Sequence, residues 1–202
     1  MATWTLPASF ADERALGERF RAASPFPHLV VDDVVEEARM SDLLAEIDEE
    51  PLSPRVADLY AFEATDPEPR TEAMRRLRSG FAAAFAGPLS RITGRAVARV
   101  DMRAYVYGPG HHLLPHTDHQ DAVGRALAWI LYLPTGTPPS GGELELFACE
   151  LEGREIVRSR SALLVAPRPN RLVVFEVGDA SLHQVREVLA GTRISLAGWF
   201  YP

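Results

Sequence analysis

Apolar positions in the first half of the chain follow the period of amphipathic helices. Between Phe10 and Ala23 they recur about every 3.6 residues, which predicts a helix over residues 11–22. Comparable spacing predicts a second helix over 34–49 and a third over 71–85. The first half of the chain is therefore expected to be mostly helical.

Residues that disfavour helix separate these segments. The pair Gly87-Pro88 should end the third helix, with one further turn over 89–92. The apolar run His28–Val31 predicts a short strand. Residues 50–69 are rich in proline and acidic residues and are too long for a simple connector, so we expect a lid or a surface loop near a site.

Beyond residue 97 the pattern changes to short apolar runs separated by Gly, Pro and Asn. The runs with the length of strands are 97–107, 126–133, 143–147, 162–166, 171–177, 182–188 and 192–201. Many short strands with turn residues between them favour a β-sandwich, a jelly roll or a barrel. The predicted architecture is therefore α+β, with the helices packed against a double-layered β domain.

The composition is that of an ordinary globular protein. The 202 residues suffice for one sizeable core, 47% of them are hydrophobic and 24% are charged. No internal repeat or linker divides the chain. We therefore expect a single domain, in which residues 1–96 are mostly helical support and residues 97–202 form the β core.

Charge and cysteine content disfavour several classes of function. The net charge of −7 argues against a nucleic-acid partner, because phosphate contacts need a basic surface. All 21 basic residues are arginine, which excludes Schiff-base chemistry on lysine. The single cysteine, Cys149, excludes an internal disulfide and a multi-cysteine metal site.

The sequence shows neither a membrane-spanning segment nor a signal peptide. No run of 18 apolar residues is present, and the first residues do not have the basic and apolar regions of a signal peptide. We therefore expect a cytoplasmic protein without a membrane partner. The sequence carries no information on the oligomeric state.

Candidate metal ligands are concentrated in the segment Leu113–Asp121, which contains His116-Thr-Asp118. In an extended chain, residues i and i+2 point to the same face, so one metal ion can bind both side chains. His183, which opens a later strand, is the best candidate for a third ligand. Two histidines and a carboxylate with open positions suit Fe(II) that binds oxygen and a co-substrate.

Less specific interpretations of these histidines remain open. A histidine in a polar loop is most often only solvated. A zinc hydrolase of the metallo-β-lactamase type is disfavoured, because Leu114 stands where that motif needs histidine and the strand-rich second half lacks alternating helices.

Arg193 lies ten residues after His183, in the apolar run 193–201. With the period of a strand, Arg193 shares one face with Ser195 and Trp199. A face with one cation, one hydroxyl and small neighbours suits a carboxylate ligand, since a buried guanidinium without an anionic partner is costly. The alternative for Arg193 is a salt bridge at a sheet edge.

Tyrosines on two predicted strands are further candidates. Tyr132 can donate a second hydrogen bond to the anion on Arg193, or it is simply a half-buried aromatic residue of a strand. Tyr105 and Tyr107 share a face of the strand that leads to the metal-binding segment, and Tyr107, which is nearer that segment, is the preferred site residue. The pair Gly141-Gly142 predicts a tight turn or a bulge.

Taken in order, these segments resemble the Fe(II)/2-oxoglutarate-dependent dioxygenases, within the prolyl-4-hydroxylase-like branch. The resemblance covers about residues 97–202 and is carried by Tyr107-Gly-Pro-Gly, His116-Thr-Asp118, Ile130-Leu-Tyr-Leu133, Gly141-Gly-Glu-Leu144, Arg171-Leu-Val-Val-Phe175, His183-Gln-Val185 and Arg193-Ile-Ser-Leu-Ala-Gly-Trp199. It implies a double-stranded β-helix, a jelly roll of the cupin type, with the N-terminal helices packed on one sheet.

The resemblance also implies roles for individual residues. It implies Fe(II) ligands at His116, Asp118 and His183, and a salt bridge from Arg193 to the distal carboxylate of 2-oxoglutarate. It also implies a hydroxyl partner of that carboxylate at Tyr132, a co-substrate contact at Tyr107 and an aromatic wall of the pocket at Trp199. Ser195 and Trp199, which share the face of Arg193, are further candidates for co-substrate binding. The implied cofactors are Fe(II), 2-oxoglutarate and O2, with ascorbate as an auxiliary reductant.

The implied reaction is hydroxylation of an unactivated C–H bond, with succinate and CO2 as co-products. Because the chain ends directly after the last predicted strand, we expect a small substrate: an amino acid, an amino-acid-derived molecule or a peptidyl residue, with proline among the candidates. Two alternatives stay open. One is a non-catalytic sandwich that binds 2-oxoglutarate or another carboxylate as a sensor, and the other is a cupin-type metalloenzyme that does not use 2-oxoglutarate.

Overall fold

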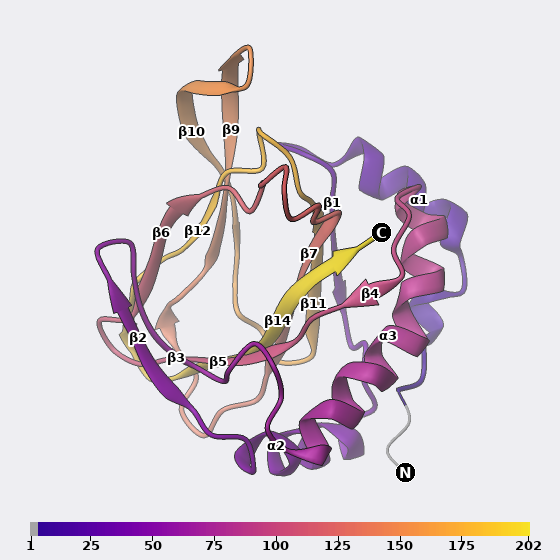
Figure 1. Ribbon diagram of the computed structural model, residues 1–202, viewed down its shortest axis with the longest axis vertical. Coiled ribbons are helices and arrows are strands. Elements are labelled where there is room, and N and C mark those ends of the chain that lie inside the picture. The colour runs from indigo at the N-terminus through magenta and orange to yellow at the C-terminus, as the bar shows by residue number, and fades with distance from the viewer. Residues whose placement is uncertain (1–3) are drawn as a thin grey trace.

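The computed structural model describes residues 4–202, which form a curled, antiparallel β-sheet with helices against one of its faces (Figure 1). The helices are the short 3-10 helix η1 (Ala8–Phe10) and the α-helices α1 (Glu13–Ala22), α2 (Glu37–Asp48) and α3 (Glu72–Thr93). Their positions agree with the three helices predicted from the apolar spacing. No helix in the described part of the chain is long and apolar enough to cross a membrane.

The strands form one large sheet and one small one. Those before the third helix are β1 (His28–Asp32), β2 (Ser53–Ala57) and β3 (Tyr60–Ala64). The later strands are β4 (Arg99–Val100), β5 (Arg103–Tyr107), β6 (His112–His116), β7 (Leu127–Leu133), β8 (Ser140–Gly141), β9 (Leu144–Glu152), β10 (Glu155–Val165), β11 (Arg171–Glu176), β12 (His183–Val185), β13 (Val188–Ala190) and β14 (Arg193–Tyr201).

Strand order explains how the sheet encloses a space. Twelve strands are joined in the order β1-β11-β7-β14-β5-β3-β6-β12-β9-β10, with β2 on β3 and β4 on β14. Strand β3 pairs with both β5 and β6 and so connects the two halves of the sheet. The halves curl toward each other (Figure 1), which gives the double-layered β architecture with helices on one side that the sequence predicts.

The core between helices and sheet is built around α3 and β7. The ring of Phe81 on α3 stacks on Trp129 of β7, with 4.1 Å between ring centroids. Successive residues of β7 point to opposite sides, so that Trp129 packs under the helices whereas Ile130 and Tyr132 pack on the inner side of the curled sheet. Strand β7 therefore separates two cores and carries residues of both.

The third helix is longer than predicted. It runs through Gly87 and Pro88 and ends at Gly94, whose φ of 72° is left-handed and whose N–H donates to the carbonyl of Ser90 at 2.9 Å. Pro88 and the following Leu89 are buried. Packing against the sheet therefore maintains the helix across a proline that would interrupt an isolated one.

Residues 50–69 contain a β-hairpin. The prediction of a lid or a surface loop was wrong in that part of this segment forms regular strands. Strands β2 and β3 pair over their whole length, and Tyr60 and Phe62 of β3 line the central cavity. The alternation of aromatic residues in β3 was the signal for a strand, but the surrounding proline and acidic residues obscured it. The expectation that this segment lies near a site is confirmed.

The hairpin of β9 and β10 also extends well beyond the short strands predicted at 143–147 and 162–166. It projects from the body of the molecule (Figure 1), and most residues of its outer half are exposed. Because neither face of this part is buried, no alternation of apolar and polar residues marks it as a strand.

Candidate metal and carboxylate site

A cavity of about 700 Å³ lies inside the curled sheet. The predicted site residues that line it are Tyr107, His116, Asp118, His183, Arg193, Ser195 and Trp199. Tyr132 does not line it and lies, fully buried, behind Arg193, with its ring centroid 5.0 Å from the guanidinium carbon. The structure thus brings together residues that are distant in the sequence.

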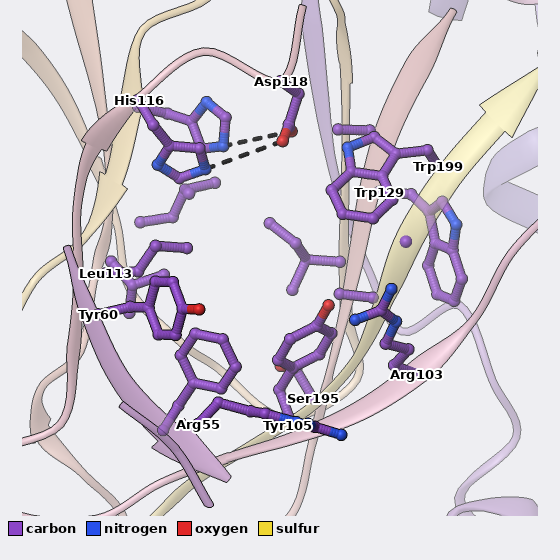
Figure 2. A pocket seen from close by; sticks show the side chains of 18 of the residues that line it. Arg55, Tyr60, Arg103, Tyr105, Leu113, His116, Asp118, Trp129, Ser195 and Trp199 are labelled. Carbon is purple, nitrogen blue, oxygen red and sulfur yellow. Dashed lines mark ion pairs between the residues drawn. The ribbon is translucent and has the colours of Figure 1, made fainter. Parts of the chain in front are cut away.

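The three candidate metal ligands come from two neighbouring strands. His116 ends β6, His183 begins β12, and these two residues are directly paired in the sheet, while Asp118 follows in the loop after β6. The carboxylate oxygens of Asp118 lie 3.8 Å from Nε2 of His116 and 3.5 Å from Nε2 of His183 (Figure 2). One ligand atom from each residue lies within 4.8 Å of the others, which is close enough for a single ion.

Both imidazole rings are held in the form that binds a metal. Nδ1 of His116 and Nδ1 of His183 each lie 2.9 Å from a backbone carbonyl, of Leu114 and Ser181 respectively. A carbonyl oxygen can only accept, so each Nδ1 donates its proton to the carbonyl and each Nε2 is the atom that is left to bind a metal. The side chains of His116 and Asp118 meet at a common point, as predicted, but Asp118 lies in the loop after β6 and not in an extended strand.

Electrostatics favour a metal cation here. Burial lowers the pKa of His183 to about 4, so that its imidazole is neutral at physiological pH. Asp118 is also buried. Two imidazoles and one carboxylate, with the remaining side open to the cavity, fit Fe(II) that binds further ligands.

Arg193 lies in a second polar region of the same cavity. It is 3% exposed, and its guanidinium carbon lies 4.7 Å from the ring centroid of Tyr107, its direct partner on β5. Within the described residues, Nε of Arg193, the hydroxyl of Tyr132 and the hydroxyl of Ser195 are buried without a hydrogen-bond partner. Unpartnered buried groups cost about 1–3 kcal/mol each, so this cluster fits an anion with several acceptor oxygens.

Register explains why these groups converge. Ser195 on β14 lies between Tyr105 on β5 and Tyr132 on β7 in the sheet. Strand β14 is central, so the alternative of a salt bridge at a sheet edge does not apply to Arg193. Burial also raises the pKa of Tyr107 above its usual value, which keeps its hydroxyl protonated.

Gly142 allows the chain to pass close to Arg193. A Cβ at this position would lie 3.2 Å from Cδ of Arg193 and 2.9 Å from a methyl carbon of Val188, and its φ of 72° is left-handed. Gly141 ends strand β8 and Gly142 follows it, both with left-handed φ, and no tight turn is formed at the pair. The close approach has a consequence for the site, because any side chain at Gly142 would press on Arg193.

Two arginines that line the cavity were not singled out from the sequence. Arg125 stacks on Trp199, with 3.7 Å from its guanidinium carbon to the ring centroid, and donates from Nη1 to the carbonyl of Asp118 at 3.1 Å. Arg103 also lines the cavity, as does Tyr105, which the sequence placed second to Tyr107. Neither arginine has a local signal, because their convergence depends on strand pairing.

Comparison with known proteins agrees with this geometry. The family model of the 2OG-Fe(II) oxygenase superfamily matches residues 102–201. The chain is 38% identical over 189 residues to prolyl 3-hydroxylase OGFOD1 of Xenopus laevis, an alignment that covers 88% of this chain and 35% of the relative. The chain spans about a third of the length of the curated relatives that it matches.

Solved structures show the same fold. A prolyl-4-hydroxylase from Pseudomonas putida superposes with a TM-score of 0.69 at 21% identity, covering 94% of this chain and 98% of that one. An oxidoreductase of the 2OG-Fe(II) oxygenase family from Burkholderia pseudomallei gives 0.72 at 14% identity, covering 100% and 96%. The predicted double-stranded β-helix with N-terminal helices is confirmed, and the chain belongs to the 2OG-Fe(II) oxygenase superfamily.

Proposed function

We propose that this chain is an Fe(II)- and 2-oxoglutarate-dependent dioxygenase. Its reaction would be hydroxylation of an unactivated C–H bond in an amino acid, an amino-acid-derived molecule or a peptidyl residue, with proline as the first candidate. The observation that carries the proposal is a cavity that holds both a compact set of metal ligands and a buried arginine whose Nε has no hydrogen-bond partner among the described residues. Proline is supported by relatives that are named as prolyl hydroxylases.

In this proposal His116, Asp118 and His183 hold the iron. When bound, Fe(II) with 2-oxoglutarate and O2 supplies the oxidising power for the C–H bond, with release of succinate and CO2. The backbone carbonyls on the two Nδ1 atoms orient the imidazoles, so that the open side of the ligand set faces the cavity. The chain thus contributes orientation and charge, and the cofactor contributes the redox chemistry.

Arg193 would bind the distal carboxylate of 2-oxoglutarate with two parallel hydrogen bonds. The hydroxyls of Tyr132 and Ser195, both without a partner among the described residues, would donate to the same carboxylate. Tyr107 covers the guanidinium and excludes water, which strengthens a charge pair at low dielectric. Trp199, with Arg125 stacked on it, would form the wall on the substrate side.

The broader setting belongs to the same proposal. Residues 1–202 would act as one catalytic domain, a view supported by the packing of α3 on β7. A cytoplasmic location without nucleic-acid or membrane partners is supported by the net charge of −7 and the single cysteine.

The proposal is tested by loading the protein anaerobically with Fe(II) and 2-oxoglutarate, admitting oxygen with ascorbate present, and measuring succinate. We expect slow succinate formation without any substrate and faster formation with proline-containing peptides. Binding of 2-oxoglutarate without succinate under all conditions would favour the sensor. Iron binding without any binding of 2-oxoglutarate would favour the cupin-type alternative.

Gly142→Ala is expected to weaken binding of 2-oxoglutarate about tenfold, because a bidentate contact tolerates little displacement of the guanidinium. Calorimetry on the anaerobic Fe(II)-loaded protein measures this. The matched control is Gly153→Ala in the β9–β10 turn, where φ is 64° and an added Cβ meets nothing within 4 Å. Both variants carry left-handed strain, so equal affinity in the two would show that the contact with Arg193 is unimportant.

A further inference from the structure

Arg103 is a cation of the cavity that the proposed chemistry does not use. It lies on β5 on the same face as Tyr105, and both residues line the cavity. Its direct partner on β14 is the small residue Ala197, which leaves room beside it. Figure 2 shows the Arg103 guanidinium and the Tyr105 hydroxyl directed into the same part of the cavity.

Arg103 and Arg193 lie at different levels of the sheet. Arg193 is paired with Tyr107 on β5. Tyr107 lies four positions after Arg103, which corresponds to about 13 Å along an extended strand. A molecule of 2-oxoglutarate that bridges Arg193 and a metal held by His116 and His183 is therefore not expected to contact Arg103 as well.

Most other charges of the cavity cancel. Arg55 is paired with Asp66 at 2.6 Å. In the proposed complex, the charges of Fe(II), dianionic 2-oxoglutarate, Asp118 and Arg193 also sum to zero. Two guanidinium groups of the cavity remain, those of Arg103 and Arg125, and Nη1 of Arg125 lies 3.8 Å from a carboxylate oxygen of Asp118.

These two cations differ in how they are held. Arg125 is fixed by its contacts with Trp199 and with the carbonyl of Asp118, although its Nε, like that of Arg103, has no hydrogen-bond partner among the described residues. In the described part of the chain, Arg103 makes no ion pair, and its Nε is buried without a hydrogen-bond partner. A half-buried guanidinium that faces a cavity without an ion-pair partner is suited to bind an anionic ligand.

Tyr105 adds a hydrogen-bond donor beside Arg103. Burial raises the pKa of Tyr105 to about 12, so its hydroxyl remains protonated. Figure 2 shows this hydroxyl on the same side of the cavity as the Arg103 guanidinium, with His116 and Asp118 on the opposite side. A ligand that contacts Tyr105 and Arg103 would thus extend away from the metal.

We propose that Arg103, together with the Tyr105 hydroxyl, forms a subsite for a carboxylate of the organic substrate. The carboxylate is either the α-carboxylate of a free amino acid or an acidic side chain next to the oxidised residue of a peptide. This proposal rests on the proposed function, because it assigns the other charges of the cavity to iron and 2-oxoglutarate. It makes Arg103 a residue that determines substrate specificity.

The test uses two matched pairs of probes, L-proline with L-prolinamide and the capped peptide Ala-Glu-Pro-Glu-Ala with its glutamine counterpart. Calorimetry measures their binding to the full chain loaded anaerobically with Fe(II) and 2-oxoglutarate. We expect at least one acid to bind about tenfold more tightly than its amide partner, which lacks the carboxylate, as a charge-assisted contact provides. The pair that shows the preference identifies the source of the carboxylate.

Variants then assign the preference to Arg103. Arg103→Gln should remove it and Arg103→Lys should retain part of it. Arg14→Gln makes the same change of charge on a side chain that is 86% exposed, and should leave the preference intact. Because the comparison of acid with amide in the unaltered protein needs no variant, a misfolded Arg103→Gln protein would not remove the test.

The proposal is overturned if neither acid binds more tightly than its amide partner, or if the preference persists unchanged in Arg103→Gln. The experiment distinguishes failure of the proposed subsite from failure of the proposed oxygenase function. Succinate formation without any preference for the acids would refute only the subsite. A preference that depends on Arg103, without succinate formation under any condition, would establish the subsite and refute the oxygenase.

Discussion

Replacing Asp118 by alanine is expected to abolish stoichiometric iron binding and, with it, succinate formation. Asp118 is buried, and its oxygens lie 3.5 and 3.8 Å from the two imidazole nitrogens that would share the ion. It supplies the only negative charge of the ligand set. Loss of a residue that merely supports a ligand costs about 10–100-fold in metal affinity, so loss of the charged ligand itself should cost more.

Iron content after desalting and the rate of succinate formation measure this effect. Asp121→Ala is a suitable control, because Asp121 lies in the same loop, its side chain is 72% exposed and it pairs with Arg154. This control should retain iron, which separates a general effect on the loop from loss of a ligand. Stoichiometric iron and undiminished succinate formation in Asp118→Ala would show that another residue completes the metal site.

Replacing Arg193 by alanine should raise the 2-oxoglutarate concentration needed for half-maximal succinate formation by about 10²-fold or more, while iron content stays unchanged. Arg193 is 3% exposed and, among the described residues, its Nε has no hydrogen-bond partner. Truncating one partner of a buried, hydrogen-bonded charge pair costs about 2–5 kcal/mol. The hydroxyls of Tyr132 and Ser195, which would bind the same carboxylate as Arg193, would also lose this ligand.

The comparison with Arg193→Lys refines the interpretation. Lysine keeps the positive charge but not the planar fork of donors, so an intermediate affinity for 2-oxoglutarate is expected. Succinate rates over a range of 2-oxoglutarate concentrations, together with calorimetry under anaerobic conditions, provide the measurement. Unchanged affinity in Arg193→Ala would eliminate its assignment as the carboxylate-binding residue and favour an enzyme that does not use 2-oxoglutarate.

Some residues that line the cavity could be identified from the sequence, and others could not. His116 and Asp118 were recognisable because the period of an extended chain places residues i and i+2 on one face. Arg193 was recognisable because a cation is unusual within an apolar run. Arg125 and Arg103 gave no such signal, since arginine near a strand end is ordinary and only pairing between strands turns these residues toward the same cavity as His183.

Strand β7 shows the same limit within a single element. All its residues from Leu127 to Leu133 are buried, so the sequence there is a continuous apolar run without alternation. The structure nevertheless sends Trp129 to the core under the helices and Tyr132 to the region of Arg193. Hydropathy cannot distinguish these two destinations, because both are removed from water.

Two local features were also decided by distant contacts. Gly87-Pro88 would end an isolated helix, yet α3 continues because its buried face packs on the sheet. Residues 50–69 have the composition of a loop, yet β3 is a strand because its backbone pairs with β5 and β6. In both cases tertiary packing outweighs a weak local preference.

The sequence by itself determined the α+β class, the positions of most helices and strands, the candidate metal ligands and the candidate carboxylate-binding arginine, because each depends on periodicity or on a residue type that is costly to bury. Only the tertiary structure decided which side chains meet in the cavity, that Gly142 lies against Arg193 and that Arg103 lines the same cavity. These features depend on the pairing of strands that are distant in sequence, and a one-residue change of register would turn each strand's side chains to the opposite face.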